Sequence, residues 1–178
     1  MENIKKGAEQ KLYQGTFISL NKVEMHFPNQ KTAEWDLIHH NGASGMLVVC
    51  PDGKILMIHQ YRPGEDRVIL EIPAGGINPG EAPKSAAIRE MEEETGAICE
   101  EVHHLITVMP SPAYNDEKVT VYYGKIKEFK ETHPDDNEFI TIEAFSLEEL
   151  VRLIMSGEIR DAKTIAAIFA YKELTTKQ

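Results

Sequence analysis

The chain has 178 residues, of which 42% are apolar and 27% charged, proportions that are ordinary for a soluble globular protein and exclude disordered or collagen-like classes. Its length fits one domain, which would bury roughly 70% of the unfolded chain's surface. The net charge of −10 argues against a duplex nucleic-acid binder, because such a protein needs a basic face to replace phosphate counterions. The sequence contains no run of roughly 18 apolar residues that would predict a membrane helix, and its start lacks the apolar stretch of a secretory signal.

The first half of the chain is predicted to form mostly strands. Alternating apolar and polar residues at 12–27 predict a strand or a hairpin. Further strands are expected at 34–40, 45–50, 54–59 and 68–72. The third and fourth of these five segments are predicted to form a hairpin around the turn signal at 51–53, and the last leads into a glycine-rich loop at 73–76.

Helices are expected at the centre and at the end of the chain. Pro83 suits a first helical position and Gly96 suits the position just past the last turn, so a central helix is predicted between them. Ser146 opens a capping box for a second helix that ends near Gly157, and Asp161 is the expected N-cap of a third. Strands at 103–109, 118–127 and 138–145 are expected between the first two helices. This order predicts an α/β fold (α+β by some schemes), a sandwich around a mixed sheet.

Acidic residues gather on the central helix, between Arg89 and Gly96. At about 100° per residue, Glu93 and Glu94 fall on either side of Glu90, so three carboxylates share an arc of roughly 100°. A solvated acidic helix face is the common explanation of such a run. The adjacent glycine-rich loop favours a different one, a site for Mg²⁺ or Mn²⁺, which take oxygen ligands. A divalent cation would also reconcile a −10 chain with a phosphate-bearing substrate.

The spacing of these residues resembles the Nudix box. Gly75 is followed after five residues by Glu81 and after seven more by the run from Arg89 to Gly96, which matches every charged and glycine position of the box. Ala97 departs from it, since the family prefers a bulkier aliphatic residue there. Four flanking segments resemble the ADP-ribose pyrophosphatase branch, namely 60–62, 71–75, 111–117 and 161–164. Pro112, fifteen residues beyond Ala97, has the spacing by which that branch is recognised.

The resemblance covers most of the chain and implies roles for particular residues. The implied metal ligands are the backbone carbonyl of Ala74 and the carboxylates of Glu90, Glu93, Glu94 and Glu138. The implied catalytic residues are Glu93, Arg89, Asp136 and Glu138, with Glu81 as a supporting residue at the helix entrance. The implied substrate-binding residues are Arg62, Glu71, Trp35, Pro112 and Glu117.

Two of these positions depart from the family pattern. Asp136 stands where close relatives have a glutamate proposed to activate water; either Asp136 does this work, or Glu138 or Glu117 replaces it, or the metals alone acidify the water. Trp35 stands where relatives often have a nucleotide-contacting arginine. Its ring could stack on a base, or it could belong to the core or to a dimer interface.

The resemblance implies a Nudix-type α/β/α sandwich and a Mg²⁺-dependent enzyme, with Mn²⁺ as a substitute. The expected substrate is a nucleoside diphosphate sugar, above all ADP-ribose, cleaved to AMP and ribose 5-phosphate. GDP-mannose or another nucleotide sugar stays open, and so does an inactive nucleotide-binding regulator. The expected organisation is an N-terminal β region at 1–40, which in relatives helps to form a homodimer, and a hydrolase domain at 41–178. Two cysteines far apart in sequence predict a reduced, cytoplasmic protein.

Overall fold

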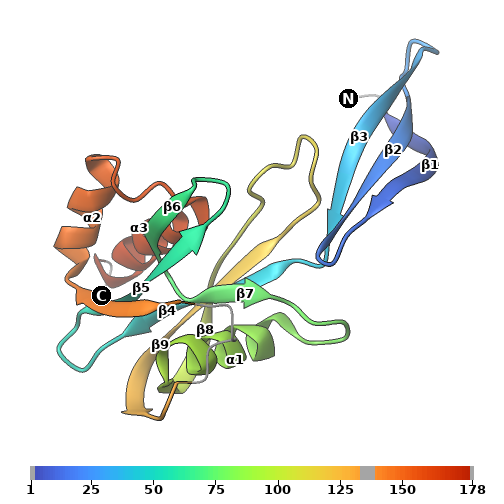
Figure 1. The fold of residues 1–178 in the computed structure, drawn as a ribbon. Helices are drawn as coiled ribbons and strands as arrows, with labels where there is room; N and C mark the ends of the chain where they lie inside the picture. Colours follow the sequence, from blue (N-terminus) through green and yellow to red (C-terminus); the bar gives the residue numbers. More distant parts are fainter. Residues whose placement is uncertain (1–2, 133–138, 177–178) are drawn as a thin grey trace. The chain divides into compact units, whose positions relative to one another are not determined.

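The computed structural model describes residues 3–132 and 139–176, and the chain divides into two compact units (Figure 1). The N-terminal unit comprises residues 1–42 together with 109–118. The sandwich unit comprises residues 43–108 together with 119–178. The second unit therefore contains the whole box that runs from Gly75 to Gly96.

The N-terminal unit is built on a three-stranded antiparallel sheet. Its strands, in spatial order, are β1 (Lys5–Gln14), β2 (Ile18–His26) and β3 (Thr32–His40). The hairpin predicted at 12–27 is confirmed, but its first strand begins at Lys5, well before the alternating pattern does. The early part of β1 is polar and wholly exposed, so pairing with β2 makes it a strand and hydropathy gives no sign of it.

The segment 109–118 adds a short parallel bridge to β3. Ile38 donates its N–H to the carbonyl of Tyr114 at 2.8 Å, and Asp116 donates its N–H to the carbonyl of Ile38 at 3.1 Å. Side chains strengthen this junction, because His39 contacts both Asp116 and, through Nε2 at 2.5 Å, Glu9 of β1. One imidazole thus joins three segments of the N-terminal unit.

His39 is expected to titrate above its ordinary range. Hydrogen bonds to Asp116 and then to Glu9 raise the pKa of His39, since both carboxylates favour the doubly protonated imidazolium. Its contribution to stability is therefore complete below the unfolded value of about 6.5 and is lost as the pH rises through the folded pKa. An NMR titration of the His39 ring should give a midpoint above 6.5 that falls in Asp116→Asn. A midpoint that ignores Asp116→Asn would contradict this assignment.

The sandwich unit is centred on a seven-stranded mixed sheet. Its strands are β4 (Ala43–Val49), β5 (Ile55–Arg62), β6 (Arg67–Glu71), β7 (Ala74–Gly76), β8 (Ala97–Val108), β9 (Val119–Phe129) and β10 (Thr141–Phe145). The main path runs β10-β5-β4-β9-β8, while β6 pairs with β5 and β7 with β4. Only the β4–β9 pair is parallel among these described strands, so the predicted mixed sheet is confirmed.

Helices cover both faces of this sheet, as Figure 1 shows for α1 on one side and for α2 and α3 on the other. They are α1 (Pro83–Thr95), α2 (Leu147–Met155) and α3 (Ala162–Thr176). Side chains of β4 alternate between the two layers: Met46 and Val48 pack with Met91 of α1, whereas Leu47 packs with Leu150 of α2. The apolar run that predicted β4 is thus a strand buried on both faces. The predicted α/β/α sandwich is confirmed.

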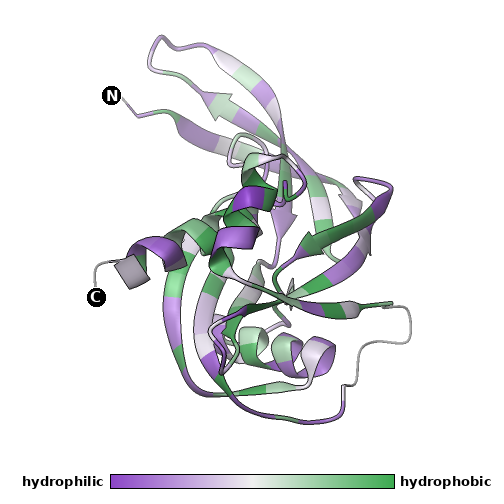
Figure 2. Cartoon of the chain, turned by 90° about the vertical axis from the view of Figure 1, so that its left-hand side faces the viewer, coloured by the Kyte–Doolittle hydropathy of each residue, from purple (hydrophilic) through white to green (hydrophobic). Residues whose placement is uncertain are grey.

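The helix ends follow the sequence signals closely. Pro83 opens α1, and Gly96 closes it with a left-handed φ of 67°. The Ser146–Glu149 capping box of α2 is complete, and Asp161 accepts a hydrogen bond from the N–H of Thr164 at the start of α3. Hydrophobic and hydrophilic stretches alternate along α3, the helix that leads to the C-terminus in Figure 2. Across the described ranges, no helix has the length and apolar character needed to span a bilayer.

Two predictions inside the sandwich unit are wrong in detail. The segment expected as a glycine-rich loop is in part the strand β7, which pairs Ala74–Gly76 with Ala43–Gly45 of β4. Small residues on both strands carry no alternation, so the pairing leaves no sequence signal. Strand β8 starts at Ala97 instead of 103. The sequence does not reveal this start, because register shifts near Cys99 break the alternation of apolar and polar residues along the first half of the strand.

Candidate metal and substrate site

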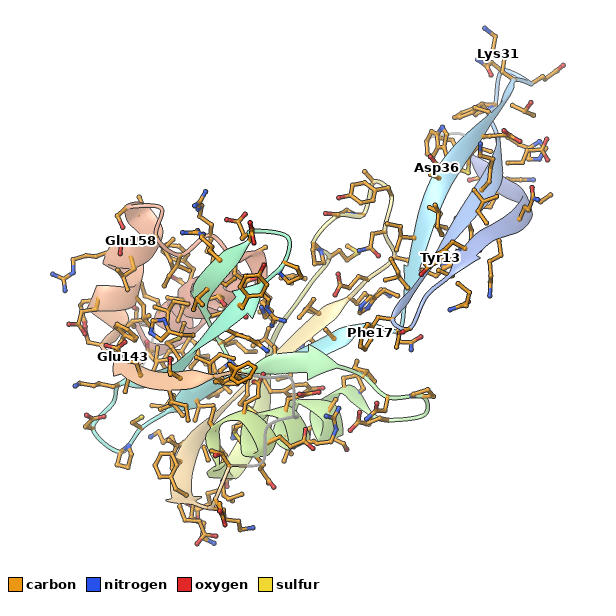
Figure 3. All side chains as sticks on the ribbon, in the orientation of Figure 1. Tyr13, Phe17, Lys31, Asp36, Glu143 and Glu158 are labelled. Atoms are coloured by element: carbon orange, nitrogen blue, oxygen red, sulfur yellow. The ribbon has the colours of Figure 1, made fainter. Side chains whose placement is uncertain are left out.

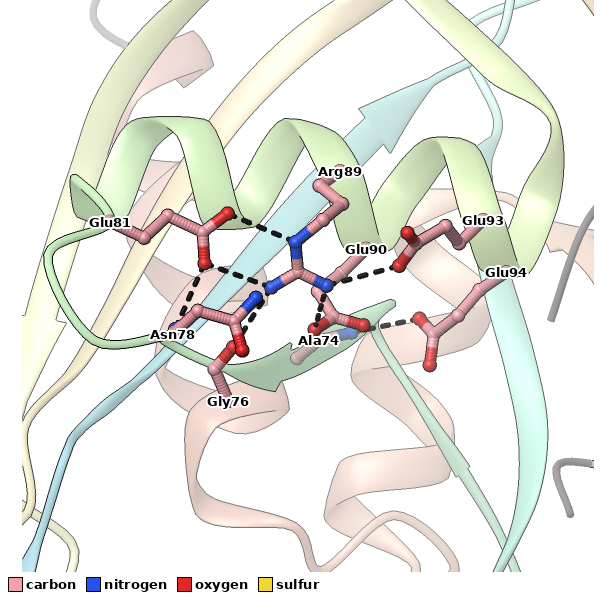
Figure 4. A network of polar contacts seen from close by, with 8 residues as sticks. All are labelled: Ala74, Gly76, Asn78, Glu81, Arg89, Glu90, Glu93 and Glu94. Atoms are coloured by element: carbon pink, nitrogen blue, oxygen red, sulfur yellow. Dashed lines mark hydrogen bonds and ion pairs between the residues drawn. The ribbon is translucent and has the colours of Figure 1, made fainter. Parts of the chain in front are cut away.

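Arg89 is the centre of an ionic network on α1 (Figure 4). Its Nε donates to Glu81 at 2.9 Å, and Nη1 donates to Glu90 at 2.7 Å and to Glu93 at 3.0 Å. Its Nη2 donates to Glu81 and to the carbonyl of Gly76, both at 3.0 Å. An i,i+4 ion pair between Arg89 and Glu93 is therefore present, as one part of a larger network.

Glu81 links the entrance of α1 to this network. Its carboxylate accepts hydrogen bonds from Arg89 and from the backbone N–H of Asn78, and these two, in that order, lower the pKa of Glu81 to about 2. The same pairing raises the pKa of Arg89. Glu81 is thus an anion at any working pH and holds the guanidinium in place, in keeping with its predicted supporting position.

Glu94 occupies the other side of the acidic face and is almost fully buried, with 2% exposure. Its Oε2 accepts a hydrogen bond from the N–H of Ala74 at 3.0 Å, so α1 is tied to β7. Four carboxylates (Glu81, Glu90, Glu93 and Glu94) thus gather around one guanidinium on this side of α1. Carboxylate oxygens of this kind are the ligands that hard divalent cations prefer.

Gly75 makes room for the carboxylate of Glu90. A Cβ at residue 75 would stand 2.2–2.4 Å from the three carboxyl atoms of Glu90, whereas a Cβ at Gly76 would meet nothing within 4 Å. The glycine of the box is therefore required by close packing of the Glu90 carboxylate on β7, and the next glycine is not.

Gly75→Ala is expected to lower kcat/KM by about 30-fold, because it displaces the end of one flexible side chain from the acidic face. The melting temperature should change by only a few degrees, since no backbone atom is in the way. Gly76→Ala is the matched control and should keep parental activity. Equal losses in the two variants would show that β7 tolerates no side chain at all, and that Glu90 is not the reason.

The described residues suit a hard divalent cation by their chemistry. Every candidate donor on this face is an oxygen, as Mg²⁺ and Mn²⁺ prefer. Among residues 3–132 and 139–176, no group of three acidic, histidine or cysteine side chains is already arranged to hold a metal ion. Arg89 holds Glu90 and Glu93 at its guanidinium, so these two carboxylates would have to turn toward the ion. Glutamate side chains have flexible ends that allow such a turn, so the donor set fits a hard divalent cation by its chemistry.

A second charged group surrounds Glu71, whose side chain is only 1% exposed. Arg62 donates through Nε to one carboxylate oxygen at 2.6 Å, and Lys163 contacts the other. Lys163 also donates to Asp161 at 3.0 Å. These residues line a cavity of about 420 Å³ in the sandwich unit, together with Arg67 and Arg160. The predicted substrate residues Arg62 and Glu71 are thus in direct contact.

The other predicted substrate residues lie in the N-terminal unit. Trp35 is half exposed on β3 and packs edge-on against Phe27, with ring centroids 5.9 Å apart. Pro112 is exposed, and Glu117 accepts a weak hydrogen bond from the side chain of Asn115 at 3.4 Å. Because Trp35 is half exposed, it does not belong to the core of the N-terminal unit. Stacking on a base and a place in a dimer interface stay predictions. Asp136 and Glu138 lie outside the described residues.

Sequence reasoning missed the partners that hold the site residues. Lys163 is 92 positions from Glu71, and Thr164, whose Oγ1 accepts the N–H of Ile72 at 3.0 Å, is equally distant from its partner. The resemblance of segment 161–164 to the pyrophosphatase branch was the one available signal, and it assigned no role to either residue.

Comparisons with known proteins show the family of this chain. The family model described as NUDIX domain matches residues 39–168. The chain is 35% identical over 165 residues to an ADP-ribose pyrophosphatase of Bacillus subtilis strain 168, covering 90% of this chain and 88% of the relative. It is 34% identical over 161 residues to a methanol dehydrogenase activator of Bacillus methanolicus, covering 89% and 87%. The crystal structure of an ADP compounds hydrolase superposes with a TM-score of 0.87 over 100% of this chain and 97% of that one, at 19% identity. The matched model spans well over half of the chain and includes the whole acidic face of α1, so this protein belongs to the Nudix family.

Proposed function

We propose that this chain is a Nudix pyrophosphohydrolase that cleaves the diphosphate of a nucleoside diphosphate sugar, with ADP-ribose as the preferred substrate and Mg²⁺ as the cofactor. The observation that carries the proposal is the acidic face of α1, where Glu90, Glu93 and Glu94 gather three carboxylates around Arg89 and beside β7. The name of the Bacillus subtilis relative supports the choice of ADP-ribose.

Each part of the site has a separate task in this reaction. Glu90, Glu93, Glu94, the carbonyl of Ala74 and Glu138 would hold the cation, with Mn²⁺ as a substitute. The chemistry that the cation supplies when bound is neutralisation of the diphosphate and a more acidic attacking water. Arg89 keeps Glu90 and Glu93 on the same side of α1. Asp136 or Glu138 is proposed to accept the proton of the water.

Arg62 is proposed to bind the diphosphate. Its Nε is committed to Glu71, while its two Nη groups make no hydrogen bond to another described residue. A guanidinium that lines a cavity with two unused Nη groups suits the oxygen pair of a phosphate. Trp35, Pro112 and Glu117, which belong to the N-terminal unit, are also proposed to bind substrate.

Product identification over a panel of diphosphate-linked nucleotides tests the proposal. With Mg²⁺, ADP-ribose should give equal amounts of AMP and ribose 5-phosphate, at a kcat/KM above those for GDP-mannose and for a dinucleoside polyphosphate. A higher kcat/KM for GDP-mannose would keep the chemistry and replace the substrate. Ligand binding without turnover in Mg²⁺ or Mn²⁺ would instead favour a regulator that has lost catalysis.

A second candidate is activation of a dehydrogenase, which the name of the Bacillus methanolicus relative suggests. It is tested by adding this chain to that organism's methanol dehydrogenase and measuring alcohol oxidation. A rate increase that is abolished in a hydrolysis-dead variant would join the two functions. An unchanged rate would remove the second.

We also propose that the protein is a reduced, cytoplasmic homodimer that pairs through its N-terminal unit. Large apolar side chains are exposed there, and Figure 3 shows Tyr13 and Phe17 at one end of the three-stranded sheet, opposite Lys31. Both cysteines are free thiols. Light scattering at assay concentration should give twice the chain mass of 20.1 kDa. A monomer at that concentration would remove the dimer.

A further inference from the structure

The buried carboxylate of Glu71 pairs with two cations, Arg62 and Lys163, and this pairing affects the orientation of the Arg62 guanidinium. Glu71 is almost completely buried, and a buried carboxylate is tolerated only when its oxygens are satisfied. Arg62 serves Oε1 and Lys163 serves Oε2. The side chain of Lys163 is itself only 12% exposed, whereas that of Arg62 is 37% exposed at the cavity. The two cations are therefore not equivalent.

Lys163 affects which hydrogen bonds Arg62 makes to the carboxylate of Glu71. A guanidinium facing a lone carboxylate prefers two parallel hydrogen bonds, one from Nε and one from an Nη group. With Lys163 on Oε2, Arg62 makes a single bond, from Nε to Oε1, and both Nη groups stay available at the cavity. If Oε2 were vacant, the guanidinium would turn to grip both oxygens, and one Nη donor would be lost.

The start of α3 fixes Lys163 in this position. Asp161 accepts hydrogen bonds from Lys163 at 3.0 Å and from the N–H of Thr164 at 2.9 Å. Thr164, fully buried, accepts the N–H of Ile72, the residue after Glu71. The first turn of α3 thus contacts both Glu71 and Ile72. Two residues after Ile72, Ala74 donates its N–H to Glu94 of α1.

We propose that Lys163 is a positioning residue, which holds Glu71 so that Arg62 presents both Nη groups to a phosphate of the substrate. The proposal rests on the proposed hydrolysis of a nucleotide sugar. In this proposal Lys163 acts through Glu71 and not by contact with substrate or cation. Lys172, in the same helix, is exposed and serves as the matched control.

Steady-state kinetics with ADP-ribose and Mg²⁺ give the first test. Lys163→Met should raise KM about tenfold with kcat changed by less than threefold, because one phosphate donor is lost. Lys163→Arg restores a cation at Oε2 and should bring KM back to within about threefold of the parent, while Lys172→Met should match the parent. A parental KM in Lys163→Met, or equal losses in the Met and Arg variants, would overturn the proposal. If Lys163→Met does not fold, Lys163→Leu, which likewise lacks a donor, replaces it under the same criteria.

An NMR test without substrate separates this proposal from the proposed function. In the parent, the Nε–H signal of Arg62, assigned by its loss in Arg62→Lys, should be protected from exchange and have no protected Nη partner. In Lys163→Met a protected Nη signal should appear beside it, with no such change in Lys172→Met. An Arg62 spectrum that ignores Lys163→Met overturns the positioning role. If the parent cleaves no nucleotide sugar and the new signal still appears in Lys163→Met, the proposed function is refuted and the positioning role is not.

Discussion

Glu94→Gln is expected to lower kcat/KM about 10³-fold, a loss of about 4 kcal/mol of transition-state stabilisation. The variant removes a negative charge from the donor set while keeping an oxygen that can accept the N–H of Ala74. Because Glu94 is buried, the neutral amide also avoids the cost of a desolvated charge. The fold should therefore survive, and far-UV circular dichroism should match the parent.

The metal contribution can be read independently of activity. Mg²⁺ should raise the melting temperature of the parent, since a ligand that binds only the folded state stabilises it. Glu94→Gln should lose most of that increase and yet melt no lower than the parent in EDTA. Glu92→Gln, on a different side of α1 from the acidic face, is the control and should behave as the parent. Near-parental turnover in Glu94→Gln would mean that the metal assignment is wrong.

Gly96→Ala is expected to destabilise the fold by about 2–4 kcal/mol, which lowers the melting temperature by roughly 5–15 °C. Gly96 has a φ of 67°, where a side chain costs about 1–2 kcal/mol. The added Cβ would also stand 2.2 Å from the carbonyl oxygen of Lys130, a backbone atom that cannot swing aside. Gly96 and Lys130 are further joined by a backbone hydrogen bond at 2.7 Å, so the clash strains the end of β9 as well.

Gly80→Ala separates the two causes of this loss. Gly80 has a φ of 80°, and an added Cβ would meet nothing within 4 Å, so only the backbone cost of about 1–2 kcal/mol applies. Urea unfolding of the two variants gives the difference directly. Equal destabilisation would show that the approach of Lys130 contributes nothing and that the left-handed backbone accounts for the whole effect.

The sequence carried the acidic site well because that site is local. Glu90, Glu93 and Glu94 lie on one helix, so a fixed turn angle places their carboxylates on a common face before any tertiary contact is known. Pro83 and Gly96 mark the ends of that helix for reasons of backbone geometry alone. The buried strand β4 was equally visible, since both of its faces are covered and every residue along it is apolar or small.

Sequence signals were weakest for strands that form by backbone pairing with a neighbouring strand and have no alternation of apolar and polar residues. Strand β7 consists of Ala-Gly-Gly and depends on the backbone of β4, and the start of β1 is mostly polar. Neither has an apolar face that would reveal it. The true role of Gly75 was likewise hidden, because a side chain there would displace a carboxylate, that of Glu90, which reaches β7 from another segment.

The sequence by itself determined the family, the sandwich architecture and the acidic face of α1, since these depend on spacing within one segment or on hydropathy along a strand. Only the tertiary structure decided how that face is held, through Arg89 to Glu81 and through Glu94 to Ala74. It alone joined Lys163 to Glu71 across 92 residues. A charge pair between distant segments depends on how the chain folds back, and no local pattern encodes it.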